Sequence, residues 1–162
     1  MCAEVLGCGN SICVVPCRSD DLGEIVDILG LCPEAAPWSE RSLRGTLEKY
    51  PESILLVRQN QRIAGFVVGR RAADEVEILN LAVRPEWRRR GVGRALVQAL
   101  LHSFTGQGEV RVFLEVRESN VDGICFYGRL GFQQVGRRAA YYRNPTEAAL
   151  VLELTTGPSG TV

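Results

Sequence analysis

A chain of 162 residues in which 46% of the side chains are hydrophobic is large and apolar enough for one globular domain with a full core. Its 19 basic and 19 acidic side chains cancel, so its overall charge gives no reason to expect a nucleic-acid partner or a membrane surface. We find no apolar run that could span a membrane and no basic start of a signal peptide, and we expect a soluble cytoplasmic protein.

The first half of the chain predicts a strand, two helices and then three more strands. Residues 1–10 are expected to form a flexible extension. An apolar stripe at residues 22–29 predicts a helix, and Ser39 is a suitable N-cap for a second one. Asn60 and Gln61 are expected to form a hairpin turn. The predicted strands are residues 11–17, 53–58, 63–70 and 75–83.

The second half predicts a helix–strand–helix unit and two closing strands. Residues 92–104 are apolar on most sides and should form a helix buried against the sheet. Further elements are expected as a strand at 110–116, a helix from about 120 to 130, strands at 132–136 and 148–154, and a flexible tail at 155–162. This order predicts one α/β (α+β) domain at 11–154, with a mixed, mostly antiparallel sheet of about seven strands flanked by four helices.

The six cysteines match no zinc-binding pattern. Four of them lie in the first 17 residues, at spacings that contain no Cys-x-x-Cys pair. A redox or metal-binding tail is one interpretation, and reduced cytosolic thiols, some of them buried, are the favoured one. The single histidine, His102, lies in a predicted helix, so we expect no metal site.

The turn between the strand that ends at Val83 and the helix that begins at Val92 has the features of an anion site. Gly91 and Gly93 lack a Cβ, so a ligand can approach the backbone closely. The first N–H groups of a helix have no partner within it, and they carry positive potential. Three consecutive arginines, residues 88–90, add charge. We therefore predict a phosphorylated cofactor with its pyrophosphate on this turn.

Two common phosphate-binding patterns do not fit this turn. A Walker loop would need Gly-Lys-Ser or Gly-Lys-Thr, and a dinucleotide fingerprint would need glycine where Leu96 stands. The turn instead resembles the acetyl-CoA loop of the GNAT superfamily of N-acetyltransferases, Arg/Gln-x-x-Gly-x-Gly/Ala, which here reads Arg88-x-x-Gly91-x-Gly93. An ordinary basic strand-to-helix turn is the alternative interpretation.

A narrower resemblance is carried by motifs elsewhere in the chain and extends over about residues 11–154. The motifs are Pro-Trp-Ser-Glu around Trp38, Leu-Glu-Val-Arg-x-Ser-Asn ending at Asn120, Tyr-x-x-Leu-Gly-Phe beginning at Tyr127, and Gly-x-Arg-x-x-Tyr-Tyr ending at Tyr142. With these motifs the chain resembles the bacterial ribosomal-protein alanine N-acetyltransferases (RimI-like).

This resemblance implies the GNAT fold and acetyl transfer from acetyl-CoA to a protein N-terminal α-amine, with the alanine of a small-subunit ribosomal protein as acceptor and no metal. It implies that Glu115 is the general base and Tyr127 the general acid. The residues that it assigns to the cofactor are Leu81, Ala82, Val83, Arg88, Arg89, Arg90, Gly91, Val92, Gly93, Arg94 and Asn120. The residues expected to lie over the peptide, or equally to pack in the core, are Trp38, Tyr141 and Tyr142.

Elementary chemistry supports the two catalytic roles. The amine must lose a proton to attack a thioester, which a carboxylate can accept, and the departing thiolate needs a proton, which a phenol can supply. The competing interpretations are a salt-bridged surface position for Glu115 and a core aromatic for Tyr127. For the whole chain, the alternatives are acetylation of a lysine or a small amine, and a non-catalytic acetyl-CoA-binding domain. We expect a monomer or weak dimer.

Overall fold

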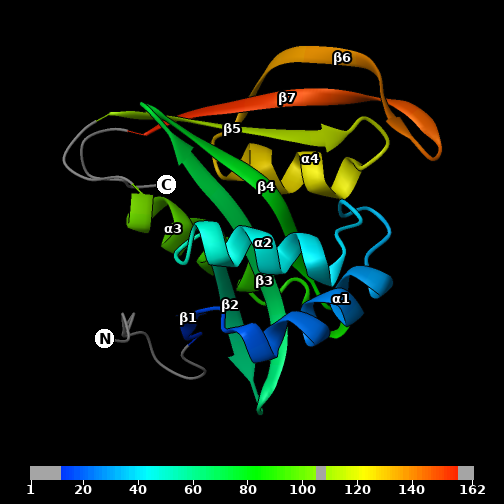
Figure 1. The fold of residues 1–162 in the computed structure, drawn as a ribbon. Helices are drawn as coiled ribbons and strands as arrows, with labels where there is room; N and C mark the ends of the chain where they lie inside the picture. Colours follow the sequence, from blue (N-terminus) through cyan, green and yellow to red (C-terminus); the bar gives the residue numbers. More distant parts are fainter. Residues whose placement is uncertain (1–11, 105–108, 157–162) are drawn as a thin grey trace. The chain divides into compact units, whose positions relative to one another are not determined.

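The computed structural model describes residues 12–104 and 109–156 (Figure 1). The expected extension at 1–10 and residues 157–162 of the expected tail lie outside the described residues. Within the described ranges the chain divides into two compact units, which are considered one at a time. The first unit comprises residues 12–69 and 80–103, and the second comprises 70–79, 104 and 109–156.

The first unit holds the helices predicted in the first half of the chain and the helix that follows the glycine turn. Its elements are β1 (Val14–Pro16), α1 (Leu22–Leu31), α2 (Glu40–Lys49), β2 (Ile54–Gln59), most of β3 (Arg62–Ala72), the end of β4 (Glu75–Val83) and α3 (Val92–Phe104) up to Ser103. Short 3-10 turns at Ser19–Asp21 and Pro85–Trp87 precede α1 and follow β4.

Local sequence signals explain where several of these elements begin and end. The Ser39 hydroxyl accepts a hydrogen bond from the Ser42 N–H at 3.1 Å, as expected for the N-cap of α2. Asn60 and Gln61 both adopt left-handed φ angles, 50° and 66°, which two-residue hairpin turns of type I′ require. The predicted cap and the predicted turn are both confirmed.

The core of the first unit surrounds β3, which is buried at every position from Ile63 to Gly69. A strand that is buried on both faces has a continuous run of apolar residues in its sequence, and residues 63–69 form such a run. The largest fully buried side chains come from β2, β3 and the helices: Phe66, Leu22, Ile25, Ile28, Leu43, Ile54, Leu56, Ile63, Leu96, Leu100 and Leu101.

The second unit is built from the start of β4, β5 (Val110–Arg117), α4 (Val121–Arg129), β6 (Gln133–Arg143) and β7 (Thr146–Thr156). β4 and β5 run parallel, with four pairs in register from Glu75↔Arg111 to Ile78↔Leu114. β7 pairs antiparallel with both β5 and β6. These pairings place β5 between a parallel neighbour, β4, and an antiparallel one, β7.

Two strands in this unit are longer than the sequence predicted. β6 was expected to end at residue 136 and continues to Arg143, while β7 continues to Thr156, two residues into the expected tail. The register of β6 shifts between Arg138 and Tyr142, and Ala140 has a left-handed φ of 50°. This irregularity and the exposure of most of β6 remove the alternating pattern from which a strand is recognised.

Hydrogen bonding orders the strands as β1-β2-β3-β4-β5-β7-β6. Seven strands, mostly antiparallel, accompanied by four α-helices in the described part of the chain, confirm the predicted fold class. Among the described residues, none of the helices has both the length and the apolar character needed to cross a bilayer.

Candidate active site

The glycine turn in the first unit has the geometry expected of an anion site. Arg89 and Gly91 have left-handed φ angles of 61° and 83°, which turn the chain sharply between β4 and α3. The Ala95 N–H donates to the Gly91 C=O at 3.0 Å, so the Val92 and Gly93 N–H groups belong to the first helical turn, whose donors have no intrahelical acceptor. Positive potential gathers at this helix end.

The arginines of the turn are not equivalent. The side chains of Arg89, Arg90 and Arg94 are exposed at the surface, with Arg90 stacked over the Trp87 ring at 5.1 Å. Arg88 is engaged within the protein instead. Its guanidinium donates from Nε to the Val83 carbonyl at 3.0 Å and from Nη2 to Glu34 at 2.5 Å. The predicted cofactor residue Arg88 thus braces the turn with its side chain.

Arg88 also contacts a buried thiol, that of Cys32. The Sγ atom of Cys32 lies 3.2 Å from Nη2 of Arg88 and 3.5 Å from the Val83 carbonyl oxygen. Burial, partly offset by Arg88, raises the pKa of the Cys32 thiol. The thiol therefore stays protonated near neutral pH and can donate to Val83 while it accepts from Arg88.

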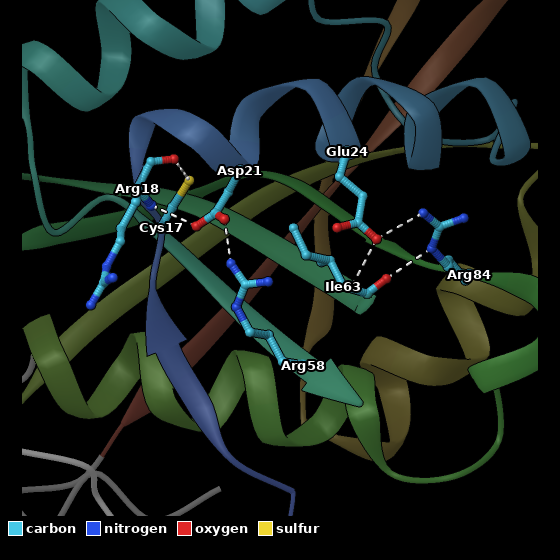
Figure 2. A network of polar contacts seen from close by, with 7 residues as sticks. All are labelled: Cys17, Arg18, Asp21, Glu24, Arg58, Ile63 and Arg84. Atoms are coloured by element: carbon cyan, nitrogen blue, oxygen red, sulfur yellow. Dashed lines mark hydrogen bonds and ion pairs between the residues drawn. The ribbon is translucent and has the colours of Figure 1, made fainter. Parts of the chain in front are cut away.

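The end of β4, predicted to lie along the pantetheine arm, is fixed by a buried arginine. Figure 2 shows Arg84 donating from Nε to the Ile63 carbonyl at 2.8 Å and pairing with Glu24 at 3.1 Å, while Glu24 also accepts from the Ile63 N–H at 2.9 Å. A Cβ on Gly65 would lie 2.8 Å from the Ala82 carbonyl oxygen, so a glycine is needed where β3 passes this strand end. Leu81, Ala82 and Val83 are thereby held in one position.

Trp38 lies half-buried in the loop between α1 and α2. The buried Asn80 side chain of β4 donates to the Ala36 carbonyl of this loop at 2.9 Å. The sequence singled out neither Asn80 nor Arg84, Glu24 or Glu34. Their partners are 21 to 60 positions away in the chain, and no local pattern indicates such pairs.

In the second unit, Glu115 lies on β5 and is mostly buried, with 20% of its side chain exposed. Nε of Arg138 is 3.0 Å from its carboxylate. A hydrogen bond to Glu115 raises the pKa of the Tyr141 phenol to about 12. Arg117, two residues further along β5, does not pair with Glu115: it pairs with Glu147 and stacks on the ring of Tyr142 in β6.

Two further tyrosines of the second unit, Tyr127 and Tyr142, lie close enough to influence each other. Tyr127 on α4 is 8% exposed and packs edge-to-face against Phe126 and Phe132, at centroid distances of 5.0 and 5.5 Å. Burial, with a smaller contribution from Tyr142, raises the pKa of Tyr127 above its ordinary value. Tyr142 is half-buried with Arg117 4.1 Å from its ring centre, and burial, followed by Glu115, raises its pKa. In the second unit Glu115 therefore acts on Tyr141 and Tyr142, and Tyr142 in turn acts on Tyr127.

Asn120, predicted to touch the cofactor, caps α4. Its side-chain oxygen accepts from the Gly123 N–H at 2.9 Å. Just before it, the Ser119 N–H and hydroxyl donate to the Glu147 carboxylate at 3.1 and 2.9 Å, and the Ser119 N–H holds the pKa of Glu147 below its usual value. The β6–β7 hairpin is in this way tied to the start of α4. Glu147 was absent from the predicted site.

Within the described ranges, no three potential metal-ligand side chains gather at one place. Four cysteines lie in the described part of the chain and none of them forms a disulfide there: Cys13, Cys17, Cys32 and Cys125.

A sheet of this strand order, with a glycine turn at the start of α3 and a carboxylate and phenols on β5, α4 and β6, defines an N-acetyltransferase. Residues 22–132 match the model of the acetyltransferase (GNAT) family. The chain belongs to this family, and the predicted enzyme class is confirmed.

Individual relatives narrow the resemblance. The chain is 37% identical over 125 residues, 74% of this chain and 82% of the relative, to the ribosomal protein bS18-alanine N-acetyltransferase of Salmonella typhimurium. The crystal structure of the ribosomal-protein-S18-alanine N-acetyltransferase from Escherichia coli matches with a TM-score of 0.74 and 30% identity, covering 89% of this chain and 93% of that one. Ard1 from Thermoplasma volcanium matches with a TM-score of 0.81 and 26% identity, covering 88% and 96%.

Proposed function

We propose that this enzyme transfers the acetyl group of acetyl-CoA to the α-amine of an N-terminal alanine on a small-subunit ribosomal protein, with bS18 as the leading candidate. The observation that carries the proposal is the identity to a relative of that name over four-fifths of the relative's length. Lysine or small-amine acetylation remains the runner-up.

The residues of the glycine turn suit the pyrophosphate of acetyl-CoA. The N–H groups at the start of α3 and the exposed Arg89, Arg90 and Arg94 offer donors and positive charge to a dianion. The backbone of Leu81 to Val83 is rigidly held beside it and suits the amide groups of pantetheine. Acetyl-CoA supplies the activated thioester, and these residues bind and orient it.

Proton transfer is assigned to the second unit. Glu115 accepts the proton that the acceptor amine must lose, directly or through a water molecule. Tyr127 donates a proton to the CoA thiolate. The phenol is protonated at neutral pH, and because burial raises its pKa it is a weaker acid than an exposed tyrosine, so the transfer requires the thiolate to lie close to it. Asn120 would contact CoA with the part of its side chain that does not cap α4. Trp38, Tyr141 and Tyr142 would line the path of the acceptor.

The preference for an α-amine follows from acidity. An α-amino group has a reference pKa near ~8, against ~10.4 for lysine. Near neutral pH a far larger share of an α-amine is already unprotonated. A carboxylate base of modest strength therefore suffices for an α-amine, whereas a lysine demands a harder deprotonation.

A competition between two peptides of one sequence tests the proposal. One peptide has a free N-terminal alanine and a blocked lysine, and the other has a blocked N-terminus and a free lysine. Incubated together with the enzyme and acetyl-CoA, the first should gain almost all of the acetyl groups, as measured by mass spectrometry. Preferential labelling of the second peptide would reject the α-amine assignment and promote the runner-up.

A second pair of peptides tests the preference for alanine as the first residue of the acceptor. Replacing the N-terminal alanine by glutamate in the first peptide keeps the α-amine and changes only the first side chain. Equal kcat/KM for both would contradict a specific preference for alanine.

A further inference from the structure

The loop between α1 and α2, residues 32–39, is attached to β4 and its turn at three points of the first unit. The Cys32 thiol meets the Val83 carbonyl, Glu34 meets Arg88, and the Ala36 carbonyl accepts from the side chain of Asn80. Trp38 lies two residues beyond the last of these attachments. The position of Trp38 therefore depends on contacts with the strand that leads into the cofactor turn.

Arg88 is the central member of this set. Its Nε and Nη2 atoms are taken by one carbonyl, one thiol and one carboxylate, all from the protein. Charge-assisted hydrogen bonds of this kind fix a long side chain in one orientation. The same nitrogen atoms cannot also hold a pyrophosphate without giving up one of these partners.

The strand side of the contact is the rigid side. Arg84, directly after β4, is buried and bound to both Glu24 and the Ile63 backbone (Figure 2). The Glu34–Arg88 pair is more open, with 36% and 40% of the side chains exposed. If the pair is broken, the loop at 32–39 moves and the strand end stays in place.

We propose that Glu34, acting through Arg88, is a positioning residue for the acceptor. The pair holds the loop that carries Trp38 in the orientation in which the acceptor binds, and the Arg88 side chain serves this loop instead of the pyrophosphate. The assignment rests on the proposed function in one respect, which is that Trp38 borders the acceptor.

The kinetic test compares Glu34→Gln with Arg88→Gln. Both should raise the acceptor KM by about fivefold, the scale of a partly exposed ion pair, while kcat and the Kd of acetyl-CoA stay at the wild-type values. The double variant should be no worse than Arg88→Gln alone, because Arg88→Gln already removes the contact with Glu34. The matched control is Glu40→Gln, which breaks an exposed ion pair with Arg44 on α2 and should change neither constant.

If Arg88 instead binds the pyrophosphate, a different result is expected. In that case Arg88→Gln would weaken acetyl-CoA binding, measured by calorimetry, while Glu34→Gln would leave it unchanged or strengthen it. That split, or additive effects in the double variant, would overturn the assignment.

A second measurement needs no acceptor at all. The chain has two tryptophans, so Trp87→Phe leaves Trp38 as the only one. In this background, Glu34→Gln should increase acrylamide quenching of Trp38 fluorescence, and Glu40→Gln, although nearer in sequence, should not. Unchanged quenching rejects the positioning role. Increased quenching in a protein that acetylates neither test peptide would instead place the failure in the proposed acceptor.

Discussion

At Glu115 the carboxylate already holds two donors, the Arg138 guanidinium and the Tyr141 phenol. If Glu115 is the proposed base, the acceptor amine has to approach beside these donors or replace one of them. Arg138 is 60% exposed, so it can be displaced at small cost. With 20% of its side chain exposed, Glu115 is also within reach of solvent.

Replacing Glu115 with Gln should lower turnover by roughly 10²–10⁴-fold, because an amide keeps the shape but cannot accept the proton. The affinity for acetyl-CoA should change little, as titration calorimetry would record. Arg138→Gln serves as the control, since it removes the same ion pair and leaves the carboxylate in place. Equal losses in the two variants would assign the effect to the ion pair and not to a base.

Cys17 allows a test of burial through its acidity. Burial, then Asp21, with Arg58 acting in the opposite sense, raises the pKa of Cys17 to about 12. At pH 8 about one thiol in 10⁴ is ionised. Iodoacetamide should therefore modify Cys17 only after unfolding in urea, and the exposed Cys125 already in the folded protein, as mapped by peptide mass spectrometry.

The same shift fixes a pH dependence. The folded protein holds the Cys17 proton more tightly than the unfolded chain, whose thiol has the ordinary value of 9.0. The contribution to stability is complete below pH 9 and is lost as pH rises toward 12. Cys17→Ala should flatten this part of the stability profile. An unchanged alkaline profile would contradict the raised pKa.

At the scale of elements, the boundaries of β4 and α3 matched the sequence prediction because the residues between them are unambiguous. Pro85 cannot continue a strand, and Gly91 adopts the left-handed angle that precedes the helix. β6 was cut short because its irregularity near Ala140 breaks the alternating pattern. The partners of Arg88 and Arg138 were missed because sequence gives a residue's element but not the direction of its side chain.

A negative charge placed at the start of α3 should prevent the binding of acetyl-CoA there. Gly93→Asp puts a carboxylate into the first turn, where the proposed pyrophosphate would lie, so acetyl-CoA binding should become undetectable by calorimetry. Gln98→Glu, later on the same helix, adds the same charge away from that turn and should keep most of the affinity. Wild-type affinity in Gly93→Asp would remove the cofactor from this turn.

The cap of α4 separates two possible roles of Asn120. Asn120→Ala should destabilise the protein by about 1 kcal/mol in urea unfolding, the usual cost of a lost N-cap. Asn120→Asp retains the oxygen that accepts from Gly123, so it should remain stable. Its negative charge should nevertheless weaken acetyl-CoA binding if the cofactor passes nearby. An unchanged free energy of unfolding in Asn120→Ala would show that the cap does not contribute to stability.

At the scale of the whole molecule, ion pairs and hydrogen bonds between residues far apart in the chain fix the predicted elements against one another. The sequence predicts the elements but not these contacts. Arg84 and Glu24 are 60 positions apart, and an isolated buried arginine cannot be told from an exposed one by its neighbours in the sequence. The fold class was accessible because it depends on the order of elements. The buried polar contacts depend on the finished fold and were not accessible.

Removing the buried guanidinium should therefore affect stability globally. Arg84→Ala leaves the Ile63 carbonyl and the Glu24 carboxylate without their donor and should cost about 3 kcal/mol. The melting temperature, followed by circular dichroism, should fall by roughly 10 °C. Arg44→Ala, which breaks an exposed pair on α2, should change it by less than about 2 °C. Similar decreases of the melting temperature in both variants would contradict the conclusion that the buried Arg84 contacts stabilise the fold more than an exposed ion pair does.

The two outermost strands of the sheet are β1 and β6, and neither offers a clean edge. β1 is three residues long and ends in Pro16, which has no N–H to donate. β6 carries the irregularity near Ala140 and three arginines: Arg137, Arg138 and Arg143. Short edges, proline, irregularities and positive charge all hinder edge-to-edge pairing between copies. Copies of the folded protein are in this way hindered from aggregating through the edges of their sheets.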